Sequence, residues 1–293
     1  MSWHQLVMEL DRAELPGVED ACTALGAIAL ALADAGDEPL LEPAPGATPL
    51  WRDIRLRALF AETAEPSLLA ATLVAVLGLP ASAIRIEHVA DCAWEREWLK
   101  DFRPMRFGRR LWVCPAGERP EVEAPVVLEL DPGLAFGTGT HATTALCLEW
   151  LDARVLEGSR VLDFGCGSGI LALAALKLGA AAATAFDIDP QARLATRENA
   201  QKNGLSKRIA VARDADVIKG PFDCVLANIL ASPLIELAPR LAAYGRHGSA
   251  LVLAGMLGAQ ASEVAEAYRP WFDIETAAER EGWTLLAGCR RAE

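Results

Sequence analysis

Three glycines are spaced as in a nucleotide-binding turn. Gly165, Gly167 and Gly169 stand at alternate positions between two apolar runs, 161–164 and 170–178. This pattern predicts a short buried strand, a tight turn and a helix. Glycine tolerates positive φ and lets a ligand lie against bare backbone, and a helix N-terminus offers unpaired N–H groups. The sequence therefore predicts a nucleotide or nucleoside site at this corner.

The residues around the turn favour a nucleoside without phosphate. The dinucleotide fingerprint is G-x-G-x-x-G, whereas here the spacing is G-x-G-x-G and the bulky Ile170 follows. Asp163 stands just before the turn, where a carboxylate suits a cationic amino group better than a pyrophosphate. Asp187 ends the next apolar run, 22 residues after Gly165, and can accept hydrogen bonds from two ribose hydroxyls. These features predict S-adenosylmethionine; the alternative is a plain turn with glycines for packing.

Asn228 is the candidate catalytic residue. It is the one polar residue between the apolar runs 224–227 and 229–231, at the end of a predicted strand. Its amide oxygen can accept a hydrogen bond from a substrate amine and aim the lone pair of that amine. The alternative is an amide that ties down its own turn. We favour the first, because Gly165, Asp187 and Asn228 all follow predicted strands and would share one edge of a parallel sheet.

A loop rich in glycine and threonine precedes the glycine turn. Residues 131–144 hold three glycines and four threonines, which disfavours a long regular element. Such a loop can cover a ligand and supply hydroxyls. Thr143 and Thr144 begin a predicted helix, 145–151, so the loop is either a ligand cover or simply a capped helix start. His141 can be a base, but a loop histidine is more often a hydrogen-bonding strut.

The rest of the chain predicts two α/β bodies. Residues 1–92 carry the order β-α-β-β-α-β, which fits a ferredoxin-like α+β domain, either for substrate recognition or as an accessory that only stabilises. A connector, 93–118, begins with a helix that has Trp94, Trp98 and Phe102 four residues apart. In 119–293, strands alternate with helices and end in a hairpin, which predicts an open parallel sheet with an antiparallel end.

Composition restricts the class of protein. The chain has 293 residues, a net charge of −12 and seven cysteines without C-x-x-C spacing. The acidity disfavours a nucleic-acid footprint, and the cysteines indicate a reducing compartment with no metal site. An apolar run of membrane-spanning length and a secretory signal are both lacking, so we expect a cytoplasmic protein.

Four motifs together resemble one family. They are LDPGLAFGTGTH (130–141), DFGCGSGILA (163–172), DIDP (187–190) and ANIL (227–230). This set resembles the PrmA-type methyltransferases, which methylate lysine side chains and the α-amino group of the eleventh protein of the large ribosomal subunit. The resemblance is strong over 126–260 and looser over 1–120.

The resemblance implies a class I, Rossmann-like methyltransferase domain with a mixed seven-stranded sheet behind a ferredoxin-like domain. It implies S-adenosyl-L-methionine as cofactor and the ribosomal protein, free or on the ribosome, as partner. From the acidity and the lack of a membrane-spanning run we expect neither direct nucleic-acid binding nor membrane binding. Carried over, Thr144, Gly165, Asp187 and Asn228 are cofactor contacts, to which the turn adds Asp163 and Gly167. The reaction would be in-line displacement at the sulfonium methyl by an amine made neutral by desolvation, with catalysis mainly by positioning.

Three other functions fit parts of the sequence. A methyltransferase for RNA or a small molecule would use the same fold, but the acidity counts against RNA. An NAD-dependent oxidoreductase is disfavoured by Ile170, which replaces the third fingerprint glycine, and by Asp163. A binding module without catalysis is the remaining alternative, and labelled S-adenosylmethionine would separate all of these.

Overall fold

The chain divides into two compact units, Met1–Trp94 and Glu95–Glu293. The computed structural model describes residues 2–38, 48–90, 103–120, 122–123, 125–131 and 139–292. Each unit has its own buried apolar core, which is the mark of a separate domain. The expected linker helix after residue 92 and half of the glycine–threonine loop, 132–138, lie outside the described residues. Within the described ranges, no helix is long and apolar enough to span a membrane.

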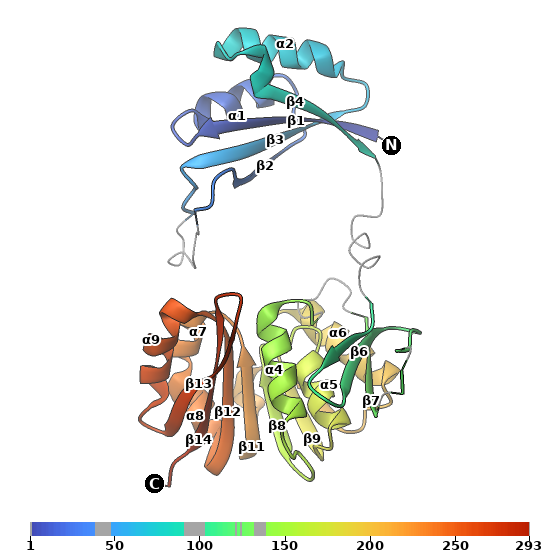
Figure 1. Ribbon diagram of the computed structural model, residues 1–293, viewed down its shortest axis with the longest axis vertical. Coiled ribbons are helices and arrows are strands. Elements are labelled where there is room, and N and C mark those ends of the chain that lie inside the picture. The colour runs from blue at the N-terminus through green and yellow to red at the C-terminus, as the bar shows by residue number, and fades with distance from the viewer. Residues whose placement is uncertain are drawn as a thin grey trace. The chain divides into compact units, whose positions relative to one another are not determined.

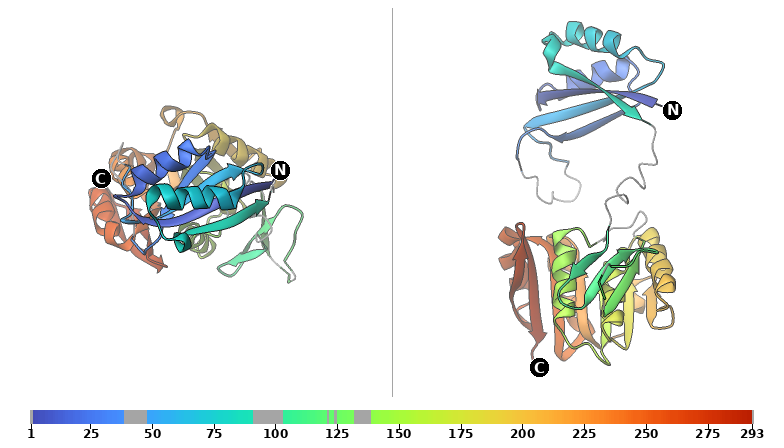
Figure 2. Two further views of the ribbon diagram at one scale, coloured as in Figure 1. Left: turned by 90° about the horizontal axis from the view of Figure 1, so that it is seen from above. Right: turned by 45° about the vertical axis from the view of Figure 1, so that its right-hand side comes forward.

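The N-terminal unit is a four-stranded antiparallel sheet with two helices on one face (Figure 2). Its strands lie in the order β2-β3-β1-β4, and all three pairings are antiparallel. The order of elements along the chain is the predicted β-α-β-β-α-β: β1 (Ser2–Asp11), α1 (Leu15–Ala24), β2 (Ala29–Asp34), β3 (Asp53–Ala61), α2 (Pro66–Leu77) and β4 (Ile84–Ala90), with a short 3-10 turn, Ala81–Ala83, before β4.

Alternation along β3 explains which face the helices cover. Ile54, Leu56, Ala58 and Phe60 are buried, whereas the residues between them are partly or fully exposed. The buried set packs with Leu73 of α2 and with apolar residues of α1. Period-2 alternation puts one row of side chains against the helices and the other row toward solvent. The second face of this sheet therefore carries its polar side chains.

The C-terminal unit is built on a seven-stranded mixed sheet in the order β10-β9-β8-β11-β12-β14-β13. All neighbours are parallel except that β14 runs antiparallel to both β12 and β13. The predicted α/β sheet with an antiparallel hairpin at its end is thus confirmed. The strands are β8 (Arg160–Phe164), β9 (Ala182–Phe186), β10 (Ile209–Ala212), β11 (Phe222–Asn228), β12 (Gly245–Leu257), β13 (Phe272–Arg280) and β14 (Trp283–Arg290).

Helices cover both faces of this sheet (Figure 1). Neighbouring residues of β8 belong to different cores, Val161 to the one that includes α4 and α5, and Leu162 to the one that includes α7, α8 and α9. A strand buried on both faces reads as a continuous apolar run, which is why 161–164 was recognisable. The helices are α4 (Ala142–Asp152), α5 (Ile170–Lys177), α6 (Pro190–Lys202), α7 (Ala231–Glu236), α8 (Ala238–Tyr244) and α9 (Gly258–Tyr268).

Three details of these helices were not predicted. Helices α7 and α8 are separate and meet at Leu237, because Pro239 lacks the N–H that would continue the hydrogen-bond ladder of one helix. Helix α4 begins at Ala142, three residues earlier than expected, with His141 as its cap. Helix α9 was not anticipated.

A separate small sheet joins β5 (Met105–Phe107), β6 (Leu111–Pro115) and β7 (Val126–Leu130) in that order. Strands β5 and β6 fall within the segment expected to be a connector, 93–118. The carboxylate of Asp152, at the end of α4, accepts hydrogen bonds from the backbone N–H groups of Arg109, Arg110 and Leu111 at 2.6 to 3.3 Å. This buried carboxylate ties the turn between β5 and β6 to the helix whose other end borders the candidate site.

Candidate active site

A cavity of about 670 Å³ opens at the carboxyl ends of β8, β9 and β11. Its volume suits a nucleoside-sized ligand, and its wall is mainly apolar with a few polar groups. Four predicted site residues, Gly165, Gly167, Asp187 and Asn228, border this one cavity. Its lining is His141, Thr143, Phe164, Gly165, Gly167, Phe186, Asp187, Ile188, Asn228, Ile229, Leu230, Pro233, Leu237, Gly255 and Trp283.

The glycine turn hooks the end of β8 onto the end of β9. The backbone N–H groups of Gly165 and Cys166 both donate to the carbonyl oxygen of Phe186, at 2.8 and 2.9 Å. Gly165, Gly167 and Gly169 all have positive φ, as expected for this turn. A Cβ on Gly165 would also collide with the side chain of Ile229. The turn therefore needs glycine for its backbone and for the space beside it.

Asp187 is held at the rim of the cavity. One carboxylate oxygen accepts from the N–H of Gly167 at 2.9 Å, and the other accepts from the N–H of Asp189 at 3.0 Å. A carboxylate has about four lone-pair positions, so each oxygen can accept one more hydrogen bond. This arrangement leaves acceptors for the two ribose hydroxyls that the sequence predicts as its ligands.

Asp163 lies beneath the turn and is fully buried. Its Oδ2 accepts from the N–H of Ala172 at 3.0 Å, and its Oδ1 has no hydrogen-bond partner among the described residues. The pKa of this carboxyl is raised to about 7, mainly by burial and in part by the nearby Asp187, although the Ala172 bond lowers it. An approaching cation would favour its charged form, but its predicted role as a partner of the cofactor amino group stays a prediction.

His141 and Trp283 form one wall of the cavity. His141 caps α4: its ring nitrogen Nδ1 lies 2.8 Å from the hydroxyl of Thr143 and 3.4 Å from the backbone nitrogen of Thr143. Its ring meets the indole of Trp283 edge to face, with centroids 4.8 Å apart. The strut interpretation of His141 accords with this geometry.

Asn228 ends β11, and its side chain is held from the first turn of α4. Its Nδ2 donates to Oγ1 of Thr144 at 3.3 Å. Thr144 is only 1% exposed and does not line the cavity, whereas Thr143 does. The cofactor contact that the sequence predicts for Thr144 stays a prediction.

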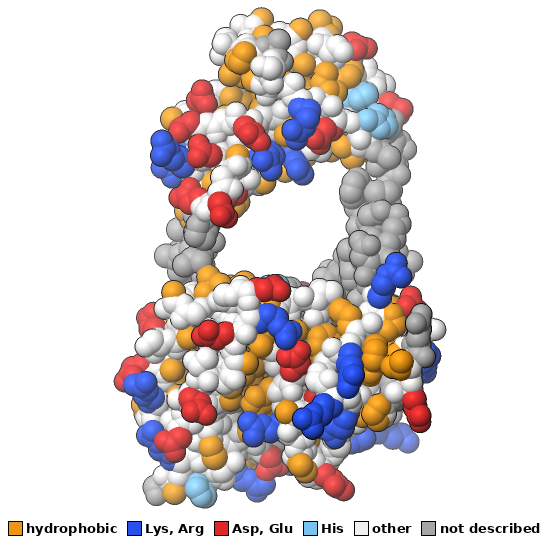
Figure 3. Space-filling model, viewed as in Figure 1, with side chains coloured by type: hydrophobic (Ala, Val, Ile, Leu, Met, Phe, Trp, Pro, Cys, Tyr) orange, Lys and Arg blue, Asp and Glu red, His pale blue; other side chains and the backbone are white. Residues whose placement is uncertain are grey.

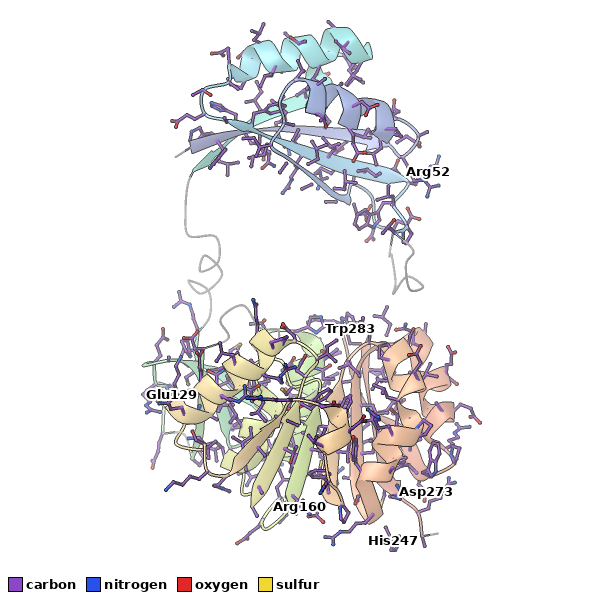
Figure 4. The ribbon with its side chains drawn as sticks, turned by 180° about the vertical axis from the view of Figure 1, so that it is seen from behind. Arg52, Glu129, Arg160, His247, Asp273 and Trp283 are labelled. Carbon is purple, nitrogen blue, oxygen red and sulfur yellow. The ribbon has the colours of Figure 1, made fainter. Side chains whose placement is uncertain are left out.

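Sequence reasoning missed Trp283 and Gly255. Trp283 lies at the opposite end of the unit from Arg160, which starts β8, and therefore at the end that carries the cavity (Figure 4). The signal for it was Gly282, a turn residue that brings the start of β14 to that end. Gly255 has positive φ in β12, and a Cβ there would collide with the backbone of Ile229. A glycine inside a predicted strand is a sign of such a close approach.

Cys166, inside the glycine turn, has no features of a nucleophile. It is 5% exposed, its Sγ lies 3.3 Å from Oγ1 of Thr196, and burial raises the pKa of its thiol. A protonated buried thiol is a weak nucleophile. Cys166 is therefore a small residue that fits the turn.

The strand order, the terminal hairpin and a glycine turn after a central strand define a class I, Rossmann-like methyltransferase domain. The chain belongs to the ribosomal protein L11 methyltransferase (PrmA) family, whose profile matches residues 2–291.

Full-length relatives agree with this assignment. A ribosomal protein L11 methyltransferase of Pseudomonas paraeruginosa is 50% identical over 295 residues and covers 100% of both chains. One of Methylococcus capsulatus is 51% identical over 295 residues and covers 99% of both chains. Among solved structures, the ribosomal protein L11 methylase of Lactobacillus delbrueckii subsp. bulgaricus is 32% identical, with a TM-score of 0.60, over 65% of this chain and 100% of its own.

Proposed function

We propose that this chain is an S-adenosyl-L-methionine-dependent protein methyltransferase that methylates lysine ε-amino groups and the N-terminal α-amino group of ribosomal protein L11. The printed names of its full-length relatives support the substrate. The single observation that carries the chemistry is that the glycine turn, Asp187 and Asn228 border one cavity. This cavity can place a nucleoside beside an amide aimed at an incoming amine.

The residues present fit the cofactor. The backbone of Gly165 and Gly167 would lie against its amino acid part, and Asp187 would accept the ribose hydroxyls. Asp163 completes the proposed set, below the turn. The apolar wall around these groups fits a nucleoside that carries no phosphate. When bound, the cofactor supplies an activated methyl group on a sulfonium.

The acceptor amine must arrive neutral and oriented. A lysine in water has a pKa of about 10.4, so only a small fraction is neutral at pH 7. The apolar lining of the cavity disfavours the charged form and lowers this pKa. The Oδ1 of Asn228 would accept an N–H of the amine and turn its lone pair toward the methyl carbon. The bound cofactor would supply the methyl group to this lone pair, and the methylated amine would lose a proton to solvent.

The N-terminal unit is proposed as a ferredoxin-like domain for recognition of the protein substrate, over residues 1–92. Its strand order, β2-β3-β1-β4 with two helices on one face, fits that fold. Residues 1–94 carry 14 acidic and 5 basic side chains, a net charge of −9 out of −12 for the whole chain. A protein that binds ribosomal RNA must carry lysine and arginine, so this acidity fits such a partner. Residues 93–118 would connect this domain to the methyltransferase domain, 119–293.

The proposed substrate is met in the cytoplasm, free or on the ribosome. The test is to incubate the protein with methyl-labelled S-adenosyl-L-methionine and ribosomes from a strain that lacks this enzyme. We expect label in ribosomal protein L11 alone, and loss of about 99% of the rate with Asn228→Ala. Label in ribosomal RNA would instead support the rival RNA methyltransferase, and no transfer to either would refute the proposal.

A further inference from the structure

The orientation of the Asn228 amide decides what this group can do. An amide presents an acceptor oxygen on one edge and a donor NH₂ on the other. If the oxygen faces a substrate amine, it accepts an N–H and turns the nitrogen lone pair toward the methyl carbon. If the NH₂ faces the amine, it donates to that lone pair and blocks attack. A catalytic amide therefore needs a second group that holds it in one orientation.

The hydroxyl of Thr144 contacts one edge of this amide. Nδ2 of Asn228 donates to Oγ1 of Thr144 at 3.3 Å, between residues 84 positions apart in the chain. Thr144 is 1% exposed, so water does not compete freely for its hydroxyl. Oδ1 of Asn228 has no hydrogen-bond partner among the described residues. Because the amide is planar, a fixed nitrogen also fixes the oxygen.

The backbone that carries Asn228 is fixed as well. The N–H of the next residue, Ile229, donates to the carbonyl oxygen of Ala254 at 3.1 Å. A Cβ on Gly255 would collide with the backbone of Ile229, and a Cβ on Gly165 would collide with its side chain. The peptide is therefore packed from both sides without room to shift. Side-chain rotation is the freedom that remains for Asn228, and the bond to Thr144 restrains it.

We propose that Thr144 is a positioning residue that holds the Asn228 amide with its oxygen toward the acceptor amine. This role is distinct from the cofactor contact that the sequence predicts for Thr144. It rests on the proposed function, because it assigns Asn228 its amine. It also explains why a buried hydroxyl that does not line the cavity stands opposite a catalytic side chain.

The two roles of Thr144 predict different kinetics. In Thr144→Val the amide loses its partner on the nitrogen side, so kcat falls about 10-fold while the dissociation constant of the cofactor stays within about 3-fold. In Thr144→Ser the hydroxyl remains, and kcat stays within about 3-fold of wild type. If Thr144 acted mainly on the cofactor, Thr144→Val would instead raise the dissociation constant of the cofactor by more than about 3-fold. Binding is measured by calorimetry and turnover with labelled cofactor and L11.

The chain offers a matched control in Thr284. It is fully buried in β14 of the same unit, and its hydroxyl has no hydrogen-bond partner among the described residues. Thr284→Val makes the same chemical change without removing a bond to Asn228, so we expect kcat to stay within about 2-fold. An equal fall of kcat in Thr284→Val and Thr144→Val would mean that burial of any new methyl group disturbs the site, which would overturn the proposal.

A double-mutant cycle is the decisive test. If Thr144 acts through Asn228, then Thr144→Val added to Asn228→Ala lowers kcat by less than about 2-fold more. A further 10-fold loss in that background would overturn the positioning role. If Thr144→Val does not fold, as judged by its unfolding midpoint, Thr144→Ala takes its place in the same cycle. Wild-type protein that does not methylate L11 would refute the proposed function itself, which is a different result from a cycle without coupling.

Discussion

The two units of the chain differ in their cavities and in their net charge. The C-terminal unit, Glu95–Glu293, holds the 670 Å³ cavity and has a net charge of −3, with 26 acidic and 23 basic side chains. The N-terminal unit, Met1–Trp94, has a net charge of −9 in half the length. A cavity of about 140 Å³ lies there between β1 and the end of α2, too small for a nucleoside.

The surfaces of the units differ in the same sense. Acidic and arginine side chains gather over the strands of the N-terminal unit, whereas α2 has no charged residue (Figure 3). Two ion pairs lie on the face of the sheet away from the helices. Arg55 of β3 pairs with Glu9 of the neighbouring β1, and Arg85 pairs with Glu87 within β4. Under the proposed function, the comparison assigns methyl transfer to a concave apolar site and recognition of the protein substrate to an exposed charged sheet.

Removal of residues 1–94 tests this division most strongly. Because each unit has its own apolar core, the remaining chain should fold and bind cofactor within about 2-fold of wild type. We expect kcat/KM for intact L11 to fall by at least about 100-fold, since the proposed docking surface is lost. Steady-state kinetics and calorimetry on the same preparation measure both quantities. Equal activity toward L11 without these residues would show that the N-terminal unit has another task.

Cofactor binding in the C-terminal unit can be weakened without changing recognition of the protein substrate. In Asp187→Ala two charge-assisted acceptors for the ribose are lost, together with the bond to Gly167. We expect cofactor binding to weaken by about 2 kcal/mol, or about 30-fold, while KM for L11 changes little. Asp189→Ala is the matched control, because Asp189 caps α6 through the N–H of Gln191 and does not line the cavity. Unchanged affinity in Asp187→Ala by calorimetry would refute the ribose role.

In the C-terminal unit, local sequence patterns predicted individual strands, turns and helices well. They did not predict the contacts between residues that are distant in the chain. The spacing of the glycines and the apolar run before them were sufficient for β8, the turn and α5, since both elements are buried on all sides. The pairing of Thr144 with Asn228 spans 84 residues and has no local signal. Trp283 was missed because a tryptophan after a turn glycine is equally compatible with packing. The turn between β5 and β6 is held by Asp152, a single buried carboxylate far along the chain, which no local pattern indicates.

Asp163 gives a prediction about pH. Burial raises the pKa of this carboxyl in the folded protein to about 7, well above the usual value of about 3.9. Between these values the folded state holds the proton more tightly than the unfolded state, so stability falls as pH rises toward 7 and levels off above it. From pH 5.5 to 7 this group alone should cost about 2 kcal/mol.

The variant Asp163→Asn should lack this loss, because an amide does not ionise and can keep the bond from Ala172. Urea unfolding of both proteins without cofactor, at several pH values from 5.5 to 8, gives the difference. The free energy of unfolding of Asp163→Asn should exceed that of wild type by an amount that grows as the pH rises. A gap that does not change across this range would mean that Asp163 is charged throughout and paired in a way that its burial does not indicate.

The smallest effect that we expect is that of salt on KM for L11, which tests the difference in charge between the two units. Added salt screens long-range attraction, since the Debye length is about 10 Å at 0.1 M and shorter above it. If the acidic N-terminal unit attracts a basic ribosomal protein, raising NaCl from 50 to 300 mM should raise KM for L11 several-fold and leave cofactor affinity nearly unchanged. The residual activity of the chain without residues 1–94 should depend less on salt, because most of the net charge goes with that unit. If the full chain and the chain without residues 1–94 show the same salt dependence, the attraction lies in the C-terminal unit. Charge would then not distinguish the roles of the two units.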